Sequence, residues 1–452
     1  MLQCQNMDYK QYFKGKKVTV MGLGLLGRGL GVIKFLADCG ADLIVTDLKT
    51  REELAPSLKK LSQYKNIEYV LGDHRLEDFR NRDFIVRAPN APLDSIYLAE
   101  AHKNGVPVEM DASLFCKLAP AGLVTIGITG TRGKSTVTQL LVEILKAAGF
   151  TVHVGGNIKG VATLPLLKKV KANHVVVMEL DSWQCQGFGE SKISPNIAVF
   201  TTFMNDHMNY YQGDMDRYFA DKANIYRFQK EDDILILGSQ VASLVKKIDG
   251  QKLKQQIITP KVSSVASWKL KMPGEHNLYN ALLAMTAAQA LGVKDSVIKK
   301  VVQNFPGLPY RLELVKEVKG VKYYNDTNAT SPDGLYAALE SFEKYKGKII
   351  LLAGGTNASF DLDNYYKKVS KYAKGLILFK GTATDKILTQ LPKRQNFPTV
   401  VVCSMKEAFT EIKGLVKKGD LVLLSPGAKS FGVFKNEYDR GDQFNLLVKK
   451  LK

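Results

Sequence analysis

At residues 127–136 the chain reads Gly127-Ile128-Thr129-Gly130-Thr131-Arg132-Gly133-Lys134-Ser135-Thr136, between an apolar, β-branched run and apolar residues at helical spacing. A strand, a glycine loop, a Lys-Ser pair and a helix are typical of a phosphate-binding loop, in which backbone N–H groups and a helix N-terminus face phosphate oxygens. The strict pattern G-x-x-x-x-G-K-[ST] fails at Ile128, where its first glycine would fall, so a plain strand–helix turn is the alternative. We expect Lys134 to reach the phosphates and Ser135 to ligate Mg²⁺, which predicts a protein that binds ATP or GTP.

Length and composition define the class of protein. The chain has 452 residues, enough for three domains at about 150 residues each, and its 45% hydrophobic and 24% charged residues are ordinary for a globular protein. No apolar run approaches the ~20 residues of a membrane span, and the N-terminal residues lack the apolar core of a signal peptide. The five cysteines include no C-x-x-C pair, so we expect neither a disulfide framework nor a zinc site. A reduced, cytoplasmic enzyme is therefore expected.

The formal net charge of +20 raises the question of nucleic-acid binding. The lysines are spread along the whole chain, and no arginine-rich block interleaved with aromatic residues is present. We interpret the charge as a solvated basic surface that would attract anionic small substrates. Neither nucleic acid nor a membrane is expected as a partner.

A second glycine turn lies near the N-terminus, where Gly22-Leu23-Gly24-Leu25-Leu26-Gly27 follows a strand predicted over 18–21. A helix is expected next, and then a strand over 43–46 that ends at Asp47. This is the dinucleotide fingerprint, with glycines for the phosphate and an acid for the ribose. By itself it predicts a nucleotide-like phosphate on this helix or a purely structural turn, and it does not require a nicotinamide.

Polar residues also follow the strands predicted after the phosphate loop. The apolar strand expected over 174–180 carries Glu179 at its end, and the next strand, over 197–202, leads to His207. Acids at the carboxyl end of a parallel strand beside a phosphate loop lie where Mg²⁺ ligands belong. Periodicity alone is as compatible with His207 as an ordinary core or surface histidine as it is with His207 as part of the site.

The last third of the chain predicts a second doubly wound sheet. A polar loop is expected over 274–280, leading into an apolar helix over 281–290, and a hairpin over 315–324 precedes a polar cluster at 325–330. Four further strands alternate with helical stretches. We therefore expect an α/β fold with three domains, at residues 1–119, 120–307 and 308–452.

Taken together, these stretches resemble the Mur ligases of peptidoglycan precursor synthesis over nearly the whole chain. The family-like stretches are 22–27, 127–136, 155–157, 179–184, 206–208, 276–280, 308–311, 325–330 and 424–441. The N-terminal G-x-G-x-x-G and the Ser-Pro-Gly-Ala-Lys-Ser-Phe stretch favour the branch that adds D-glutamate, and the Asp-Asn-Pro-Arg motif of the diaminopimelate-adding branch is absent. The resemblance implies a Rossmann-like UDP-binding domain, a P-loop ATPase-like domain with a mainly parallel sheet, and a C-terminal Rossmann-like domain.

The resemblance also implies an activity. An ATP-dependent amide-bond ligase would add D-glutamate to UDP-N-acetylmuramoyl-L-alanine through an acyl phosphate, with Mg²⁺ as cofactor and a monomer as the expected state. Three alternatives stay open. They are a Mur-type ligase with another acceptor, a nicotinamide-dependent oxidoreductase built on the first domain, and a catalytically weak paralogue that regulates cell-wall synthesis.

Residue roles follow from the same resemblance. The catalytic residues would be Lys134, Glu179, His207 and Lys222. Ser135 or Thr136 with Glu179 would hold one Mg²⁺, and His207 with Lys222, which is carbamylated in the family, would serve a second metal. The ATP contacts would be Gly130, Thr131, Arg132, Gly133, Lys134, Ser135, Thr136, Asn277, Asn280, Arg311 and Asp326. The UDP-substrate contacts would be Gly24, Leu25, Leu26, Asp47, Leu48, Lys49 and Asn157, and the amino-acid contacts Thr330, Ser430 and Arg440.

Three positions depart from the family pattern. Asp181 stands in place of a serine, Asn328 in place of a lysine, and Ala358 in place of a lysine that pairs with the incoming glutamate. Short-range Coulomb terms of about a few kcal/mol each are large enough to alter which amino acid is preferred. Three other cations could compensate: Arg132, Lys429 and Arg440.

Overall fold

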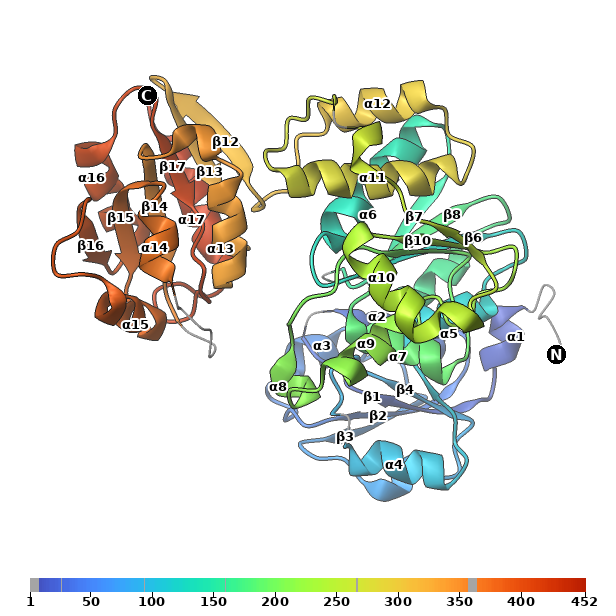
Figure 1. The fold of residues 1–452 in the computed structure, drawn as a ribbon. Helices are drawn as coiled ribbons and strands as arrows, with labels where there is room; N and C mark the ends of the chain where they lie inside the picture. The colour runs from blue at the N-terminus through green and yellow to red at the C-terminus, as the bar shows by residue number, and fades with distance from the viewer. Residues whose placement is uncertain (1–7, 26, 93, 159, 266, 357–363) are drawn as a thin grey trace. The chain divides into compact units, whose positions relative to one another are not determined.

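The computed structural model describes residues 8–25, 27–92, 94–158, 160–265, 267–356 and 364–452. The chain divides into two compact units, one of Met1–Ser267 with Tyr279–Val302 and one of Trp268–Leu278 with Gln303–Lys452. The described strands form three sheets, two in the first unit and one in the second, and helices connect most of the strands (Figure 1). The predicted α/β class is confirmed.

The first sheet has the strand order β3-β2-β1-β4-β5, and its strand pairs are parallel. Its strands are β1 (Lys17–Met21), β2 (Asp42–Asp47), β3 (Ile67–Leu71), β4 (Phe84–Arg87) and β5 (Val108–Glu109). The accompanying helices are α1 (Tyr9–Phe13), α2 (Arg28–Asp38), α3 (Ala55–Lys59), α4 (Ile96–Lys103) and α5 (Asp111–Leu118). Because β1 and β2 are neighbours, the glycine turn and Asp47 lie together at the carboxyl edge, as the fingerprint predicts.

The second sheet has the order β11-β10-β9-β6-β8-β7, again with parallel pairs. Its strands are β6 (Val124–Thr129), β7 (Val152–Gly156), β8 (Val175–Glu179), β9 (Ile197–Phe200), β10 (Ile234–Leu237) and β11 (Gln256–Ile258). Its main helices are α6 (Lys134–Ala147), α7 (Ser182–Glu190), α8 (Met208–Tyr211), α9 (Met215–Ala223), α10 (Ser239–Asp249), α11 (Glu275–Gln289) and α12 (Asp295–Asn304). Since β8 and β9 flank β6, the phosphate loop meets the ends of both strands at one edge.

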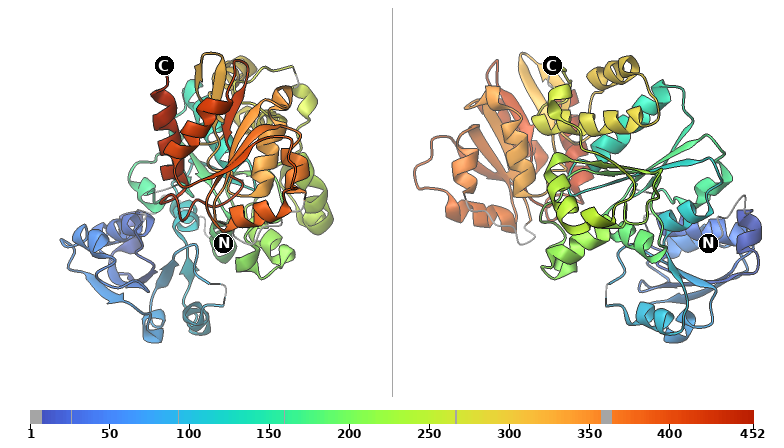
Figure 2. Two further views of the ribbon diagram at one scale, coloured as in Figure 1. Left: turned by 90° about the vertical axis from the view of Figure 1, so that its left-hand side faces the viewer. Right: turned by 45° about the vertical axis from the view of Figure 1, so that its right-hand side comes forward.

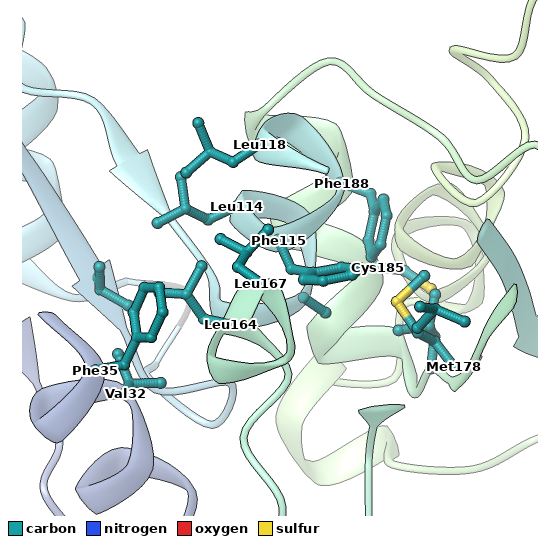
Figure 3. Close-up of a cluster of buried hydrophobic side chains, with 14 of the residues drawn as sticks. Val32, Phe35, Leu114, Phe115, Leu118, Leu164, Leu167, Met178, Cys185 and Phe188 are labelled. Atoms are coloured by element: carbon teal, nitrogen blue, oxygen red, sulfur yellow. The ribbon is translucent and has the colours of Figure 1, made fainter. Parts of the chain in front are cut away.

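One apolar cluster joins the helices of the first sheet to the second sheet. Figure 3 shows Val32 and Phe35 of α2 beside Leu164 of the short 3-10 helix η2 (Leu164–Lys168), and Phe115 of α5 on the way to Phe188 of α7. These side chains are almost fully buried, and burying apolar surface is the main stabilising contribution to such a junction. The shared core explains why the two sheets form one unit.

The third sheet has the order β12-β13-β17-β14-β15-β16, and β12 is antiparallel to β13. Its strands are β12 (Glu313–Val318), β13 (Val321–Asn325), β14 (Ile349–Gly354), β15 (Ala373–Phe379), β16 (Thr399–Val402) and β17 (Leu421–Leu424). Helices α13 (Pro332–Glu340) and α14 (Tyr365–Val369) pack on one face, and α16 (Met405–Leu415) and α17 (Glu437–Lys449) on the other, as the orange and red elements of Figure 2 show. Helix α15 (Thr382–Gln390) connects β15 to β16. The predicted hairpin and doubly wound sheet are confirmed.

Residues 274–280 correct one prediction, because they are not a loop. Helix α11 already begins at Glu275, and the Asn277 backbone N–H donates to the Gly274 carbonyl. The Asn277 side-chain amide also donates to the Pro273 carbonyl, at 2.7 Å. The ends of a helix need such polar partners, so a polar segment is compatible with a helix start as well as with a loop.

Among the described residues, no helix combines the length and the apolar character of a membrane span.

Two histidine side chains lie side by side at the edge of the second sheet. His153 Nε2 lies 3.1 Å from His174 Nδ1, and burial, with His174 and Lys169 nearby, lowers the pKa of His153. The unfolded chain, with a histidine pKa of about 6.5, therefore binds this proton more tightly, so stability falls as the pH drops below about 6.5. We expect the thermal unfolding midpoint to fall by about 1–3 °C more between pH 7.5 and 5.5 than in His153→Gln. Equal declines in both proteins would contradict this assignment.

Candidate active site

The phosphate loop has the backbone that phosphate binding requires. Gly130 and Gly133 have φ values of 142° and 89°, in the region that favours glycine. A Cβ atom at Gly130 would lie 2.0 Å from Thr201 Oγ1, and one at Gly133 would lie 2.4 Å from Asn280 Oδ1. Within the described part of the chain, no side chain caps α6 and its first turn holds no acid. The helix N-terminus therefore keeps its N–H groups and its partial positive charge for an anion.

The loop provides a direct test in Gly130→Ala. The added methyl group would also meet the backbone of Thr202 at 2.9–3.0 Å, which cannot move aside as a side chain can. We expect ADP binding, measured by calorimetry, to weaken by about 100-fold or more, because the phosphate cradle is displaced. Gly149→Ala is the matched control: Gly149 has φ 90° but no atom within 4 Å of its Cβ position. It should lose about 1–2 kcal/mol of stability and keep ADP binding; equal ADP binding by both variants would refute the cradle.

Two threonines that follow β9 hold the loop in place. The Thr202 carbonyl accepts a hydrogen bond from Thr131 N at 2.7 Å, and Thr202 Oγ1 accepts one from Arg132 N at 2.9 Å. Thr201 Oγ1 donates to the Arg132 carbonyl. Neither threonine belongs to a motif in the sequence. Their position directly after a buried strand, at the sheet edge that carries the loop, is the signal that could have found them.

Two lysines converge on one carbonyl oxygen of the loop. The Gly130 carbonyl accepts from Lys134 Nζ at 2.9 Å and from Lys222 Nζ at 3.0 Å. Lys222 is only 1% exposed, and its burial, together with the nearby Lys134, lowers its pKa to about 7. Two amines this close repel each other when both are charged, and an anion bound beside them would relieve that repulsion. The arrangement suits a phosphate or carboxylate oxygen.

Glu179 lies next to the first turn of α6. Its Oε1 accepts a hydrogen bond from Ser135 Oγ at 3.1 Å, so the structure brings together the two predicted ligands of the first metal. One hydroxyl and one carboxylate, completed by phosphate oxygens and water, fit the way Mg²⁺ binds to nucleotide enzymes. Among the described residues, no three His, Cys, Asp or Glu side chains form a metal cluster. A metal here would therefore depend on Ser135, Glu179 and substrate oxygens.

His207 is held in an unusual backbone conformation at the start of α8. Its φ of 57° is rare for a residue other than glycine, and its ring lies 4.7 Å from that of Trp183, measured between centroids. Burial lowers the pKa of His207, which favours the neutral imidazole that can bind a metal. The Tyr218 ring lies 6.3 Å from the His207 ring and 4.9 Å from Lys222 Nζ, so the two predicted ligands of the second metal share a neighbour.

The residues predicted to meet the UDP group gather at the carboxyl edge of the first sheet. Asp47 accepts hydrogen bonds from Gly24 N and Lys49 N, both at 2.9 Å, so its carboxylate shapes the turn. Leu25 and Leu48 are 52% and 64% exposed, so two apolar side chains lie open to solvent near the turn and the end of β2. Leu26 lies outside the described residues.

The predicted substrate residue Asn157 comes from the second sheet. It follows β7, and its Oδ1 accepts a hydrogen bond from Nη2 of Arg28, the first residue of α2, at 3.1 Å. Arg28 thereby links two segments of the predicted UDP site that are far apart in the sequence. Arg28 was not among the site residues predicted from the sequence.

The predicted ATP contacts are divided between the two units. Asn280 and the loop belong to the first unit, whereas Asn277, Arg311 and Asp326 belong to the second. Asp326 follows β13 and is buried; its Oδ2 accepts from Ser425 Oγ at 2.9 Å. Burial raises the pKa of Asp326 to about 7, so this carboxyl group is easily protonated near neutral pH.

The residues predicted to meet the amino acid lie in the second unit. Arg440 is fully buried and donates to Thr327 Oγ1, the Thr327 carbonyl and the Ala428 carbonyl, all neutral acceptors. Burial lowers the pKa of Arg440 to about 9. Ser430 is buried and its Oγ has no hydrogen-bond partner among the described residues, whereas Thr330 is partly exposed. Ala358 lies outside the described residues.

Comparison with known proteins decides the family. Three family models match consecutive parts of the chain: the MurD-like N-terminal domain of Mur ligases at 16–109, the Mur ligase middle domain at 128–259, and the glutamate ligase domain of Mur ligases at 310–427. The chain is 36% identical over 468 residues to the UDP-N-acetylmuramoylalanine–D-glutamate ligase of Roseiflexus sp. (strain RS-1), covering 96% of this chain and 98% of that one. It is 33% identical to the ligase of the same name from Borreliella afzelii (strain PKo), covering 97% and 98%. The chain belongs to the Mur ligase family.

Solved Mur ligase structures confirm the fold. The MurF ligase of Thermotoga maritima, solved in complex with ADP, matches with a TM-score of 0.60 at 15% identity, over 98% of this chain and 97% of that one. The MurC ligase of the same organism matches with a TM-score of 0.56 at 18% identity, over 96% and 99%. Mur ligases are ATP-dependent ligases, so the chain is an enzyme of this class. The oxidoreductase alternative is thereby wrong.

Asp181, one of the three departures from the family pattern, has a structural role in this chain. Asp181 is the N-cap of α7: its Oδ1 accepts from Gln184 N at 2.8 Å, and the Gln184 side chain accepts from Asp181 N at 3.4 Å. This is a capping box, in which serine and aspartate are both favoured at the N-cap. The exchange of serine for aspartate therefore preserves the start of the helix.

Proposed function

We propose that this Mur ligase joins D-glutamate to UDP-N-acetylmuramoyl-L-alanine with hydrolysis of ATP to ADP and phosphate. The observation that carries the chemistry is the convergence of Lys134 and Lys222 on the Gly130 carbonyl, next to the Ser135–Glu179 pair. The full-length likeness to D-glutamate ligases supports the choice of substrates.

The reaction divides into two steps. In the first, a carboxylate oxygen of the L-alanyl group attacks the γ-phosphorus of ATP, and the bond between that phosphorus and the oxygen of the departing ADP breaks. In the second, the amine of D-glutamate attacks the acyl carbon, the acyl–oxygen bond breaks, and phosphate leaves while the amine loses a proton. The phosphate released contains one oxygen of the original carboxylate.

The chain's own groups supply charge stabilisation and positioning. Lys134 and the N–H groups at the N-terminus of α6 would hold the transferring phosphoryl group, whose negative charge spreads over its oxygens during transfer. The two substrates are anions that repel each other, so fixed positive groups are needed to bring them together. Asp47 and the glycine turn would hold the UDP end of the first substrate.

We also propose that Mg²⁺ takes part, held by Ser135 and Glu179, where it would neutralise phosphate charge. A second metal site would use His207 and Lys222. The Lys222 amine, buried and with a pKa of about 7, is partly neutral at physiological pH and can react with CO₂. Its nitrogen forms a bond to the carbon of CO₂ and loses a proton, which converts a cation into an anionic oxygen ligand.

Domain limits of 1–119, 120–307 and 308–452 each enclose one matched family model, at 16–109, 128–259 and 310–427. We place the reaction in the cytoplasm, where ATP and nucleotide-linked precursors are available. We propose that the enzyme acts as a monomer, in which one chain carries the residues predicted for ATP, UDP and amino-acid binding.

The test is phosphate release with ATP, Mg²⁺ and UDP-N-acetylmuramoyl-L-alanine, with D-Glu, L-Glu, D-Asp, L-Lys and L-Ala as separate acceptors. We expect release that depends on D-Glu, together with a product whose mass equals the two substrates minus one water. Release only with another amino acid would refute the acceptor and direct attention to Asn328 and Ala358. No release with any acceptor would refute the activity and favour a regulatory paralogue.

A further inference from the structure

Arg28 occupies a position where the helix dipole disfavours a cation. It is the first residue of α2, directly after Gly27, and the positive end of a helix disfavours a positive side chain. Within the described part of the chain, α2 has no side-chain cap and no acid in its first turn. Residues that break a local rule in this way tend to serve function instead of stability.

The guanidinium of Arg28 reaches the second sheet, where its hydrogen bonds go to neutral acceptors. Its Nη2 donates to the Gly156 carbonyl at 3.2 Å and to Asn157 Oδ1 at 3.1 Å, which are both neutral. Among the described residues no carboxylate lies within ion-pair distance of Arg28. Its Nε is buried and has no hydrogen-bond partner among them either. Burial raises the pKa of Asp111, and the charge of Arg28 opposes that rise, but the Asp111 carboxylate bonds to backbone N–H groups at 163 and 164 and not to the guanidinium. A buried donor without an acceptor costs free energy, and an anion bound beside the guanidinium would offset that cost.

The surroundings of Arg28 identify the anion. The glycine turn that precedes α2 is the part of a dinucleotide fingerprint that binds the two phosphates. A planar guanidinium matches the oxygens of a phosphate group better than an ammonium does. The segment after β7 also packs close to the turn, since a Cβ atom at Gly27 would lie 3.4 Å from Gly160 Cα. Arg28 and Asn157 therefore face the same short region beside the turn.

We propose that Arg28 binds the diphosphate of the UDP-linked substrate and, through Gly156 and Asn157, fixes it relative to Glu179. This inference rests on the proposed function. Gly156 lies directly against Glu179, because a Cβ atom at Gly156 would be 2.1 Å from the Glu179 carbonyl oxygen. Arg28 thus connects the substrate's diphosphate to the strand end that carries the predicted metal ligand.

The test compares the intact enzyme with Arg28→Met, Arg28→Lys and the control Lys34→Met, which removes a cation further along α2. Calorimetry measures the binding of UDP, UMP and ADP. In Arg28→Met we expect UDP binding to weaken by about 10–100-fold, because a charge-assisted contact to the diphosphate is lost. UMP and ADP binding should change by less than about threefold, because they lack the contact or bind elsewhere, and Arg28→Lys should lie between.

Thermal unfolding distinguishes binding from a structural role. If Arg28 serves the diphosphate, the unfolding midpoint of Arg28→Met should stay close to that of the unaltered enzyme, because removing the unpartnered Nε and the cation at the helix start offsets the loss of two hydrogen bonds to neutral acceptors. Unchanged UDP binding in Arg28→Met would overturn the proposal. So would a lower midpoint with equal losses for UDP, UMP and ADP. If the unaltered enzyme itself fails to bind UDP, the proposed substrate class fails, a result that is visible without any variant.

Discussion

Lys134→Ala should lower the rate of phosphate release that depends on the acceptor amino acid by about 10³-fold or more. The Lys134 amine lies at the phosphate loop and donates to the loop carbonyls of Gly130 and Thr131 at 2.9 and 3.2 Å. In the transition state the charge on the transferring phosphoryl group grows on its outer oxygens, and removing a fixed donor there costs this much in other phosphoryl and acyl transfers. The loss should appear in kcat and in kcat/KM.

Lys146→Ala is the matched control, because it removes a lysine from the opposite end of the same helix. Lys146 is exposed and pairs only loosely with Glu143, at 3.8 Å, so its loss should change activity by less than about twofold. Both variants should unfold at temperatures close to that of the parent. Retained turnover in Lys134→Ala would refute the assignment of the loop to ATP.

Lys222→Met should lose about 10²–10³-fold in kcat while keeping or raising its unfolding temperature. The amine is buried, donates to the Gly130 carbonyl and lies over the Tyr218 ring, so an apolar side chain of similar length fills the space at a lower desolvation cost. Loss of activity without loss of stability is the signature of a functional buried lysine. The control Lys230→Met, at an exposed position shortly after α9, should change neither kcat nor the unfolding temperature.

Carbamylation of Lys222 predicts that the activity of the unaltered enzyme depends on CO₂. Activity should fall in buffer freed of CO₂ and return when bicarbonate is added, and Lys222→Met should respond to neither treatment. Enzyme equilibrated with ¹³C-bicarbonate should show a carbamate carbon resonance that is absent in Lys222→Met. If the activity of the unaltered enzyme does not change with CO₂, Lys222 acts as an amine. The second metal would then lack this ligand.

The features that could be predicted from sequence are local ones. The glycines and the Lys-Ser pair of residues 127–136 lie within one strand–loop–helix unit, so their spacing alone predicts β6, the loop and α6. The same is true of the turn after β1. The capping box at Asp181 could also have been predicted, since an Asp-x-x-Gln spacing before a helix is a known N-terminal signature.

The features that could not be predicted depend on contacts between distant segments. The supports of the loop, Thr201 and Thr202, are about seventy residues away from it in sequence, and no pattern links them to it. The lowered pKa of Lys222 arises from burial and from Lys134, which only the folded sheet brings near. Arg28 reads as an ordinary surface arginine until its side chain is seen to reach Asn157.

The most direct test of the proposed reaction follows one oxygen atom. UDP-N-acetylmuramoyl-L-alanine labelled with ¹⁸O in its carboxylate is incubated with ATP, Mg²⁺, D-Glu and the enzyme, and the phosphate released is analysed by mass spectrometry. We expect one ¹⁸O atom in each phosphate, because the carboxylate oxygen that attacks ATP leaves with the phosphoryl group when the amide forms. Unlabelled phosphate released in step with the amide product would contradict the acyl phosphate, and with it the central claim that the loop at 127–136 serves to activate a carboxylate.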